Sequence, residues 1–350
     1  MEETVTGTSP EGRAPQGDVI SASANPLLSI EDLKTYVFTP AGIVRAVDGV
    51  SFSLRPGEAM GLVGESGCGK SMTCHSIIGL LPTAARTVGG RIMFDGDDLA
   101  AKAEAELAAY RGKRIAMILQ DPLMSLNPVF TVGNQVSEVF RLDDHRASKQ
   151  TVTARVVDIL TRVKIPSAER RLRNYPFEFS GGMRQRVVAA MAMARSPRLL
   201  IADEPTTALD VTIQDQFLRL LKEMQAESGM ALILVTHNLG IVAEVCDSVA
   251  IMYAGRIVEC GSVMRVYNEP AHPYTRGLME ALPKLGVRNR RLYQIDGEPP
   301  DLCGLPSGCH FHPRCAFATG ICRREYPPAV ELPGGGCASC WLLHERGREQ

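Results

Sequence analysis

One short segment, residues 64–71, restricts the possible folds of this chain more than any other. Its sequence Gly-Glu-Ser-Gly-Cys-Gly-Lys-Ser fits the pattern G-x-x-x-x-G-K-[ST], between an apolar run at 59–63 and a helical pattern from Lys70 to about Leu81. Glycines at these positions let backbone N–H groups turn inward around phosphates, while Lys70 reaches the outer phosphates and the Ser71 hydroxyl binds Mg²⁺. The residues predicted to contact the bound group are Gly64, Ser66, Gly67, Cys68, Gly69, Lys70, Ser71 and Met72. A strand, a phosphate loop and a helix in this order predict an α/β fold.

Further apolar runs extend the predicted sheet. They lie at 114–119, 199–203, 231–235 and 248–253, and helical patterns separate them. Strands that are apolar throughout are buried on both faces, which is typical of a parallel sheet covered by helices. The stretch from 131 to 194 is mostly helical and is interrupted by Pro166 and Pro176. We therefore expect a helical subdomain at about 121–196.

Two carboxylates end the run at 199–203. Asp203 and Glu204 follow four apolar residues and precede Pro205. Asp203 is predicted to hold Mg²⁺, directly or through water, and Glu204 to polarise an attacking water as general base. The alternative, a solvated acidic loop, fits the apolar run before the pair less well.

A second anion site is predicted between the phosphate loop and these carboxylates. Ser180, Gly181 and Gly182 begin a helical pattern, where bare backbone N–H groups and the positive end of the helix dipole favour an anion. Because the chain already has one phosphate loop, a second one indicates two half-sites. Two half-sites suggest a dimer that closes over ATP.

In this order the motifs resemble those of ATP-binding cassette (ABC) ATPases across residues 28–261. The resemblance implies a P-loop nucleotide-binding domain with a RecA-like core and a helical subdomain. It implies that Ser180-Gly181-Gly182 binds the γ-phosphate of ATP held by the opposite subunit. Met183, in place of the usual Gln, is a departure that leaves the phosphate-binding Ser and glycines intact.

The same resemblance assigns further roles. Gln120 resembles the Q-loop residue that contacts Mg²⁺ or water and senses a membrane partner, and His237 resembles the switch histidine near the γ-phosphate. Asp210 ends Ala208-Leu209-Asp210, which resembles the D-loop and places Asp210 at the nucleotide site. The resemblance thus assigns catalysis to Glu204, His237 and Gln120, and Mg²⁺ to Ser71, Gln120 and Asp203.

The residue that stacks on adenine is ambiguous. Val37 stands where the family usually has an aromatic residue, between Tyr36 and Phe38. Alternation along a strand would put these two rings on one face. Tyr36 is favoured as the stacking residue, and packing of either ring in the core is the alternative.

Several longer segments of the sequence resemble the ATPases of oligopeptide/dipeptide importers. They lie at 120–128, 179–186, 252–259 and 272–276 and continue through the C-terminal segment. The resemblance implies two membrane permease subunits, a second ABC ATPase in a heterodimer, an extracytoplasmic substrate-binding protein and a peptide cargo. Relatives in this group import nickel complexes, glutathione or haem, which stay open as cargo. A soluble, non-transport ABC ATPase and a metal-sensing module with an inactive cassette are alternatives of other classes.

Composition and length define the remaining organisation. The chain has 350 residues and a formal net charge of −1, without the basic excess that nucleic-acid binders normally show. Residues 1–26 are rich in small and polar residues and are predicted to be a disordered tail. No apolar run approaches the roughly 18 residues of a membrane helix, so we expect a cytosolic chain whose membrane role comes through a partner. The resemblance to importer ATPases implies a peripheral position at the cytoplasmic face of the membrane. The ATPase domain is predicted at 27–262 and a small Cys-rich extension at 263–350, with a helix at about 264–282.

Six of the ten cysteines crowd into residues 303–340. In a reducing cytosol such crowding indicates metal binding before disulfides, and a segment with so little periodicity needs a staple. The wide spacings do not suit the paired C-x₂-C knuckles of typical zinc sites. Resemblance to the importer group implies a [4Fe–4S] cluster at Cys309, Cys315, Cys322 and Cys340, with Cys337 as an alternative fourth ligand and zinc as the alternative metal. His310 and His312 are expected at the surface.

Overall fold

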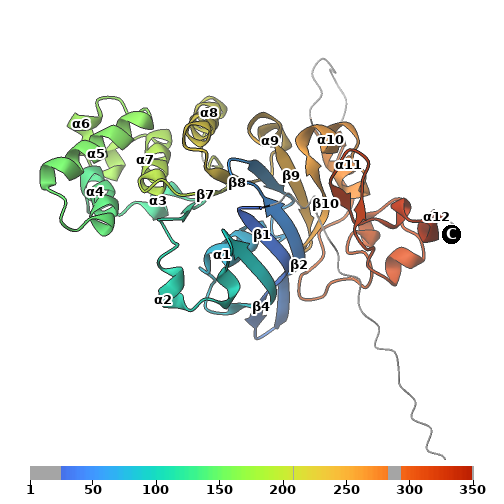
Figure 1. Ribbon diagram of the computed structural model, residues 1–350. Coiled ribbons are helices and arrows are strands. Elements are labelled where there is room, and N and C mark those ends of the chain that lie inside the picture. The colour runs from blue at the N-terminus through green and yellow to red at the C-terminus, as the bar shows by residue number, and fades with distance from the viewer. Residues whose placement is uncertain (1–24, 208, 283–292, 349–350) are drawn as a thin grey trace, which may run out of the picture.

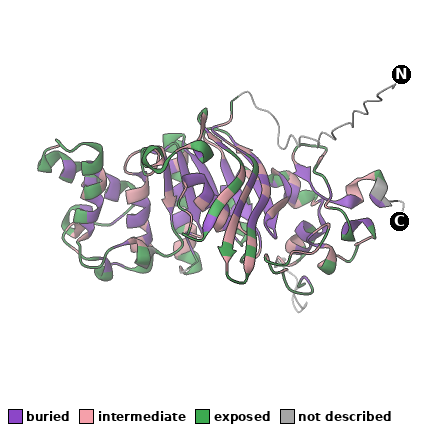
Figure 2. Ribbon diagram, turned by 90° about the horizontal axis from the view of Figure 1, so that it is seen from below, coloured by how far each residue is buried: buried purple, intermediate pink, exposed green. Residues whose placement is uncertain are grey.

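The computed structural model describes residues 25–207, 209–282 and 293–348 (Figure 1). The predicted tail therefore lies almost wholly outside the described residues, as does Ala208 of the D-loop motif. A helical body and the C-terminal extension lie at opposite ends of the molecule, and the central sheet stands between them (Figure 1). Buried residues concentrate in that central part (Figure 2).

The central sheet contains every strand that the apolar runs predict. Its strand order is β11-β12-β10-β9-β3-β8-β7-β6, and all pairs from β9 to β6 are parallel. The parallel strands are β3 (Ala59–Val63), β6 (Ile115–Ile118), β7 (Leu199–Asp203), β8 (Ala231–Thr236) and β9 (Ser248–Tyr253). The three antiparallel edge strands are β10 (Arg256–Ser262), β11 (Val330–Glu331) and β12 (Cys337–Ala338). Because parallel strands end at one edge of the sheet, the loops after β3, β6, β7 and β8 meet there.

A second, antiparallel sheet was not foreseen. It has the order β2-β1-β4-β5, formed by β1 (Leu28–Thr39), β2 (Gly42–Leu54), β4 (Ala85–Phe94) and β5 (Asp97–Asp98). Helix α1 (Lys70–Ile78) follows the phosphate loop, and its last residue, Ile78, lies three residues before the predicted end at about Leu81. Gly79, whose backbone is in the left-handed region, caps the helix. Its buried side chains share one core with both sheets.

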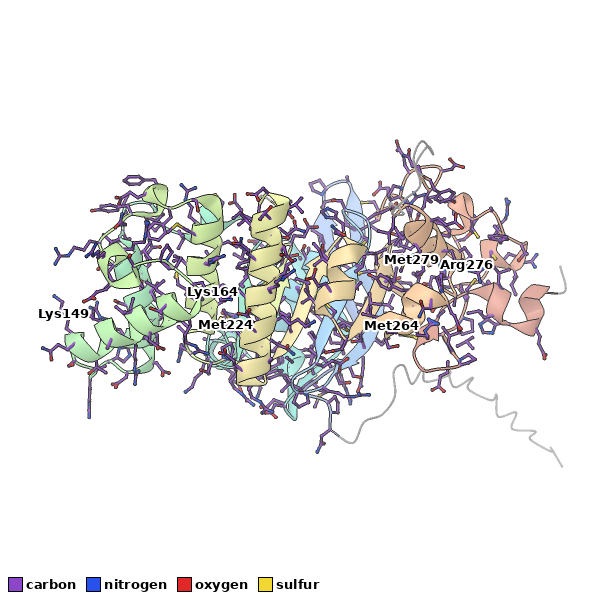
Figure 3. The ribbon with its side chains drawn as sticks, turned by 90° about the horizontal axis from the view of Figure 1, so that it is seen from above. Lys149, Lys164, Met224, Met264, Arg276 and Met279 are labelled. Carbon is purple, nitrogen blue, oxygen red and sulfur yellow. A yellow bond between two sulfur atoms is a disulfide. The ribbon has the colours of Figure 1, made fainter. Side chains whose placement is uncertain are left out.

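The helical body consists of five helices between β6 and β7. They are α3 (Pro122–Ser125), α4 (Val132–Asp143), α5 (Lys149–Arg162), α6 (Ala168–Arg171) and α7 (Gly181–Met193). Thr131, Ser148 and Ser180 cap the N-termini of α4, α5 and α7 by accepting a backbone N–H three residues on. Helix α8 (Val211–Ser228) stands between this body and the central sheet (Figure 3). Helices α2 (Glu104–Leu107) and α9 (Leu239–Val245) complete the cassette.

The extension begins with two helices instead of the single predicted one. Helices α10 (Val263–Asn268) and α11 (Pro273–Glu280) are separated because Pro270 has no N–H to continue a helix and Pro273 begins the next one. Between them the wholly buried Glu259 carboxylate accepts the backbone N–H groups of Ala271 and His272. Beyond them the chain forms turns, short 3₁₀ segments and the short helix α12 (Glu345–Arg348). A disulfide joins Cys260 of β10 to Cys337 of β12 and so attaches this segment to the sheet. In the described part of the chain, no helix has both the length and the apolar character of a membrane span.

Candidate functional site

The phosphate loop connects β3 to α1 in a conformation that depends on its glycines. Gly67 and Gly69 have φ of 77° and 107°, in the left-handed region. A Cβ on Gly64 would lie 2.2 Å from the Met252 carbonyl oxygen, and one on Gly69 would lie 2.0 Å from that of Ala46. Other side chains at these two positions would therefore displace backbone, which explains why the motif requires glycine there.

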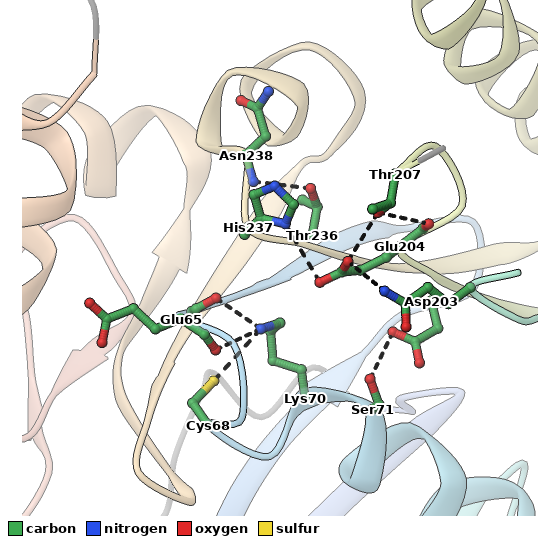
Figure 4. Close-up of polar contacts among 12 residues, drawn as sticks. Glu65, Cys68, Lys70, Ser71, Asp203, Glu204, Thr207, Thr236, His237 and Asn238 are labelled. Atoms are coloured by element: carbon green, nitrogen blue, oxygen red, sulfur yellow. Dashed lines mark hydrogen bonds and ion pairs between the residues drawn. The ribbon is translucent and has the colours of Figure 1, made fainter. Parts of the chain in front are cut away.

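Lys70 closes the loop from inside. Its Nζ donates to the carbonyl oxygens of Gly64 and Glu65 at 2.8 and 2.9 Å (Figure 4), and the side chain is buried. Cys68 Sγ lies 3.9 Å from the same Nζ, and burial raises the pKa of this thiol. A buried cation surrounded by backbone oxygens is suited to an anionic ligand at the loop, whereas Cys68 is a packed, protonated side chain.

The predicted Mg²⁺ ligands come together at the start of α1. Ser71 Oγ donates to Asp203 Oδ1 at 3.1 Å. Burial raises the pKa of Asp203, an effect that the Ser71 hydrogen bond partly offsets. A hydroxyl and a desolvated carboxylate are oxygen donors of the kind that Mg²⁺ prefers, and a cation would stabilise the buried charge. These residues fit the metal.

Glu204 lies at the centre of a second group, where the loops after β6, β7 and β8 meet (Figure 4). Gln120 Nε2 donates to Glu204 Oε2 at 3.1 Å, Thr207 Oγ1 donates to the same oxygen at 3.0 Å, and His237 Nδ1 is 3.6 Å from Oε1. The backbone of Glu204 has a φ of 43° and donates its N–H to Val235. The structure thus brings together all three predicted catalytic residues. Thr207 was missed because a hydroxyl in the motif Pro-Thr-Thr carries no signal of its own.

The second predicted anion site lies at the N-terminus of α7. Ser180 is exposed, and its Oγ accepts the Met183 N–H at 3.4 Å. A Cβ on Gly182 would lie 2.3 Å from Ile213 Cγ2. Packing therefore also requires glycine at position 182, because α7 approaches α8 closely there. The motif alone does not reveal this requirement.

Asp210 and the aromatic candidates have contacts of their own. Asp210 Oδ1 caps α8 by accepting the Ile213 N–H at 3.0 Å. The Tyr36 hydroxyl donates to Asp48 Oδ1 at 2.7 Å, and burial followed by this hydrogen bond raises the Tyr36 pKa to about 12. The Arg86 guanidinium lies 4.8 Å from the centre of the Phe38 ring. Irregular pairing of β1 between Thr35 and Val37 disturbs the simple alternation that was expected here, so adenine stacking by Tyr36 stays a prediction.

A contact between the extension and the phosphate loop was not predicted. Arg314 Nη1 and Nη2 donate to the two carboxylate oxygens of Glu65 at 2.7 and 3.1 Å, and only 5% of the Arg314 side chain is exposed. The buried Tyr274 hydroxyl accepts the Glu65 N–H at 3.0 Å. Glu65 occupies a variable position of the loop motif and lies 249 positions from Arg314, so the sequence gives no sign that they meet.

The four predicted cluster cysteines share one lobe of the extension. Burial raises the pKa of the Cys309, Cys315 and Cys340 thiols, to about 12 for Cys309 and about 11 for Cys340. Backbone N–H groups of Phe311, Phe317 and Leu342 donate to Cys309, Cys315 and Cys340 respectively, each from two residues on. Thr319 Oγ1 lies 3.4 Å from Cys322 Sγ. Within residues 25–207, 209–282 and 293–348, no three His, Cys, Asp or Glu side chains are grouped so that they could hold a single metal ion.

Two expectations about this lobe are wrong. Cys337 is bonded to Cys260 and is not a free alternative ligand, because the antiparallel pairing of β10 and β12 places the two residues opposite each other. His310 is buried, not at the surface: its Nδ1 lies 3.1 Å from the Ala254 carbonyl oxygen, and burial lowers its pKa.

Comparisons with known proteins agree with the geometry. Residues 47–207 match the family model described as ABC transporter, and residues 258–322 match that of the oligopeptide/dipeptide transporter C-terminal region. A probable peptide ABC transporter ATP-binding protein, y4tR of Sinorhizobium fredii, is 48% identical over 92% of this chain and 96% of its own length. The dipeptide transport ATP-binding protein DppD of Bacillus subtilis is 47% identical over 91% and 96%.

Solved structures give the same fold. The ATP-binding cassette MJ0796, in a dimeric post-hydrolysis state with ADP and Pi, has a TM-score of 0.61 at 23% identity and covers 67% of this chain and 98% of its own. CbiO1 of Clostridium perfringens, part of the ABC transporter complex cbiONQ, has a TM-score of 0.59 at 28% identity and covers 70% and 91%.

Proposed function

The chain belongs to the ABC transporter ATP-binding proteins of the oligopeptide/dipeptide group, and on this premise we propose that it hydrolyses ATP to power peptide import through a membrane transporter. The observation that carries the proposal is the meeting of Lys70, Ser71, Asp203, Glu204, Gln120 and His237 where the parallel strands end. We assign residues 27–262 to the cassette, about 121–196 to its helical subdomain and 263–350 to the extension.

The two neighbouring carboxylates have different roles: Asp203 holds Mg²⁺ and Glu204 acts on the attacking water. Lys70 and the loop N–H groups bind phosphate oxygens, and Ser71 and Asp203 hold the Mg²⁺ that screens their charge. Glu204 Oε1 faces His237, whereas Oε2 accepts hydrogen bonds from Gln120 and Thr207. These donors orient the carboxylate, which takes a proton from the attacking water as general base. Gln120 and His237 flank the carboxylate, at Oε2 and Oε1 respectively.

The exposed N-terminus of α7 supports a shared site. Ser180 and Gly181 are exposed at the start of a 13-residue helix, where an anion is stabilised by bare N–H groups and the dipole. We propose that this end of α7 binds the γ-phosphate of ATP held by a second ABC ATPase subunit, related but different in sequence. Two permease subunits and an extracytoplasmic substrate-binding protein complete the transporter, and the chain is peripheral at the cytoplasmic face.

For the extension we propose a [4Fe–4S] cluster held by Cys309, Cys315, Cys322 and Cys340. Four thiolates in one lobe suit such a cluster, and hydrogen bonds to the sulfurs tune clusters of this kind. Zinc is the alternative metal for the same four cysteines. Anaerobic purification should yield a coloured protein that contains iron. A colourless protein that contains zinc would refute the cluster.

Reconstitution tests the function as a whole. Vesicles that contain the permeases, both ATPases and the binding protein should take up a dipeptide or oligopeptide in the presence of ATP. Replacement of the chain by its Lys70→Ala variant should abolish uptake, because Lys70 binds the phosphates. Uptake of nickel, glutathione or haem in place of peptide, or uptake that is independent of Lys70, would contradict the proposal.

A further inference from the structure

A cavity of about 320 Å³ lies beside the phosphate loop. The cassette provides two of its walls, Val44 of β2 and the loop residues Ser66 and Gly67. The third wall comes from the C-terminal extension, residues 299–302, with the sequence Pro-Pro-Asp-Leu. Residues from opposite ends of the chain thus enclose a space that opens from the phosphate loop itself.

The position and lining of this cavity suit the nucleoside half of a nucleotide. Phosphates at the loop N–H groups leave the ribose and base to extend away from Ser66 and Gly67, toward the cavity. Its volume is at the lower end of the range for small-molecule sites, about 300–1,000 Å³. Val44 and the two proline rings offer apolar surface to the faces of a base, and burial of those faces favours binding.

The neighbouring strand shows what surface the cassette itself offers at this cavity. Val37 pairs with Val44 across β1 and β2, and directly paired residues share one face of a sheet. Both are aliphatic, so the flat rings of Pro299 and Pro300, which line the same cavity as Val44, add a rigid apolar surface for a base.

Several contacts fix the extension wall in place. The Leu302 carbonyl oxygen accepts the Arg45 N–H at 3.1 Å. Arg314, which holds the Glu65 carboxylate, also donates through Nε to the Asp296 carbonyl oxygen at 3.0 Å. One buried guanidinium therefore ties the phosphate loop to the segment that leads into the wall. A wall held in this way can contact a ligand without first being ordered.

We infer that residues 299–302 form the outer wall of the subsite for the base and ribose of ATP bound to the same chain. The extension thus contributes residues that contact the substrate, with the proline pair as its apolar surface. This inference rests on the proposed function, because it requires ATP phosphates at the loop.

Two probes separate the nucleoside subsite from the phosphate site: ATP and inorganic triphosphate, which has no base or ribose. Binding of each to the full chain would be measured by calorimetry for the wild type and for Pro299→Ala/Pro300→Ala. Loss of the apolar wall should weaken ATP binding about tenfold and leave triphosphate binding unchanged. The KM for ATP should rise by a similar factor with little change in kcat.

A matched variant completes the design. Pro327→Ala/Pro328→Ala, a second proline pair in the extension that does not line the cavity, should bind both probes as the wild type does. If Pro299→Ala/Pro300→Ala binds ATP as the wild type does, or loses both probes equally, the inference is overturned while the proposed function stands. A wild-type protein that binds neither probe would overturn both.

Discussion

Replacement of Arg314 by Ala should destabilise the protein far more than a surface arginine does. The change removes two charge-assisted hydrogen bonds to Glu65, at 2.7 and 3.1 Å, and one to the Asp296 carbonyl oxygen at 3.0 Å. Hydrogen bonds to charged groups contribute about 1.5–3 kcal/mol each and neutral ones about 1 kcal/mol. Because 27% of the Glu65 side chain is exposed, water can solvate it in the variant, and the lower values apply. The expected loss in free energy of unfolding is about 3–4 kcal/mol.

Thermal denaturation measures this loss, with Arg276→Ala as the matched control. Arg276 is an exposed extension arginine (Figure 3) whose Nε donates to one neutral acceptor, the Pro270 carbonyl oxygen, at 2.9 Å. Its loss should cost about 1 kcal/mol or less. At about 2–4 °C per kcal/mol for a domain of this size, Tm should fall by roughly 6–15 °C for Arg314→Ala and by at most about 4 °C for Arg276→Ala.

A double-mutant cycle with Glu65→Gln assigns the loss to the pair. If the guanidinium stabilises the fold through Glu65, the cycle should give a coupling energy of about 1–3 kcal/mol. A Tm for Arg314→Ala close to that of Arg276→Ala, or a coupling near zero, would refute the view that Arg314 joins the extension to the phosphate loop.

Three further changes test other parts of the structure. Gly182→Ala places a Cβ 2.3 Å from Ile213 Cγ2 and should lower the free energy of unfolding by about 1–3 kcal/mol, measured by thermal denaturation. A second change in the same chain, Ile213→Ala, should relieve the clash. An unchanged Tm for Gly182→Ala alone would contradict the close packing of α7 on α8. Burial raises the pKa of Asp203, so its ionised form disfavours folding at neutral pH and this penalty disappears as pH falls through the folded-state pKa. Asp203→Asn should therefore raise the Tm of the nucleotide-free protein at pH 7 but not below about pH 4, and should weaken Mg²⁺-dependent ATP binding; a lower Tm at pH 7 would contradict this. Cys260→Ser removes a disulfide that spans 77 positions and should lower the free energy of unfolding by about 2–4 kcal/mol, because the unfolded chain gains loop entropy. A reductant should lower the Tm of the wild type by the same amount. Equal melting curves for the variant and the wild type would exclude this effect.

The parallel sheet and the meeting of the candidate catalytic residues were predictable from the sequence because local signals determine both. The apolar runs predicted β3, β6, β7, β8 and β9, and parallel pairing brings the ends of neighbouring strands to one edge. Gln120, Asp203, Glu204 and His237 each follow or end one of those strands, so their meeting follows from the topology. The required glycines at 64 and 69 likewise reflect backbone contacts that the loop motif encodes.

Two features that escaped prediction depend on contacts between distant segments. The Cys260–Cys337 disulfide depends on a two-residue strand that has no sequence signature. Arg314 and Glu65 meet only after the extension folds back over the phosphate loop. In both cases a tertiary contact, which no local pattern encodes, determines the outcome. The break in the single predicted helix at 264–282 is different, because Pro270 and Pro273 signal it locally and the prediction overlooked them.

The central claim, that Glu204 is the general base of an ATPase, is tested most directly by Glu204→Gln. ATP binding and hydrolysis would be measured together on the complete transporter, with Glu223→Gln, a change to an exposed carboxylate on α8, as the control. The account predicts ATP affinity within about threefold of the wild type, because the phosphate loop is untouched, and hydrolysis reduced by at least 100-fold (roughly). The Glu223→Gln protein should hydrolyse ATP at the wild-type rate. Hydrolysis by Glu204→Gln at a rate near that of the wild type would contradict the account.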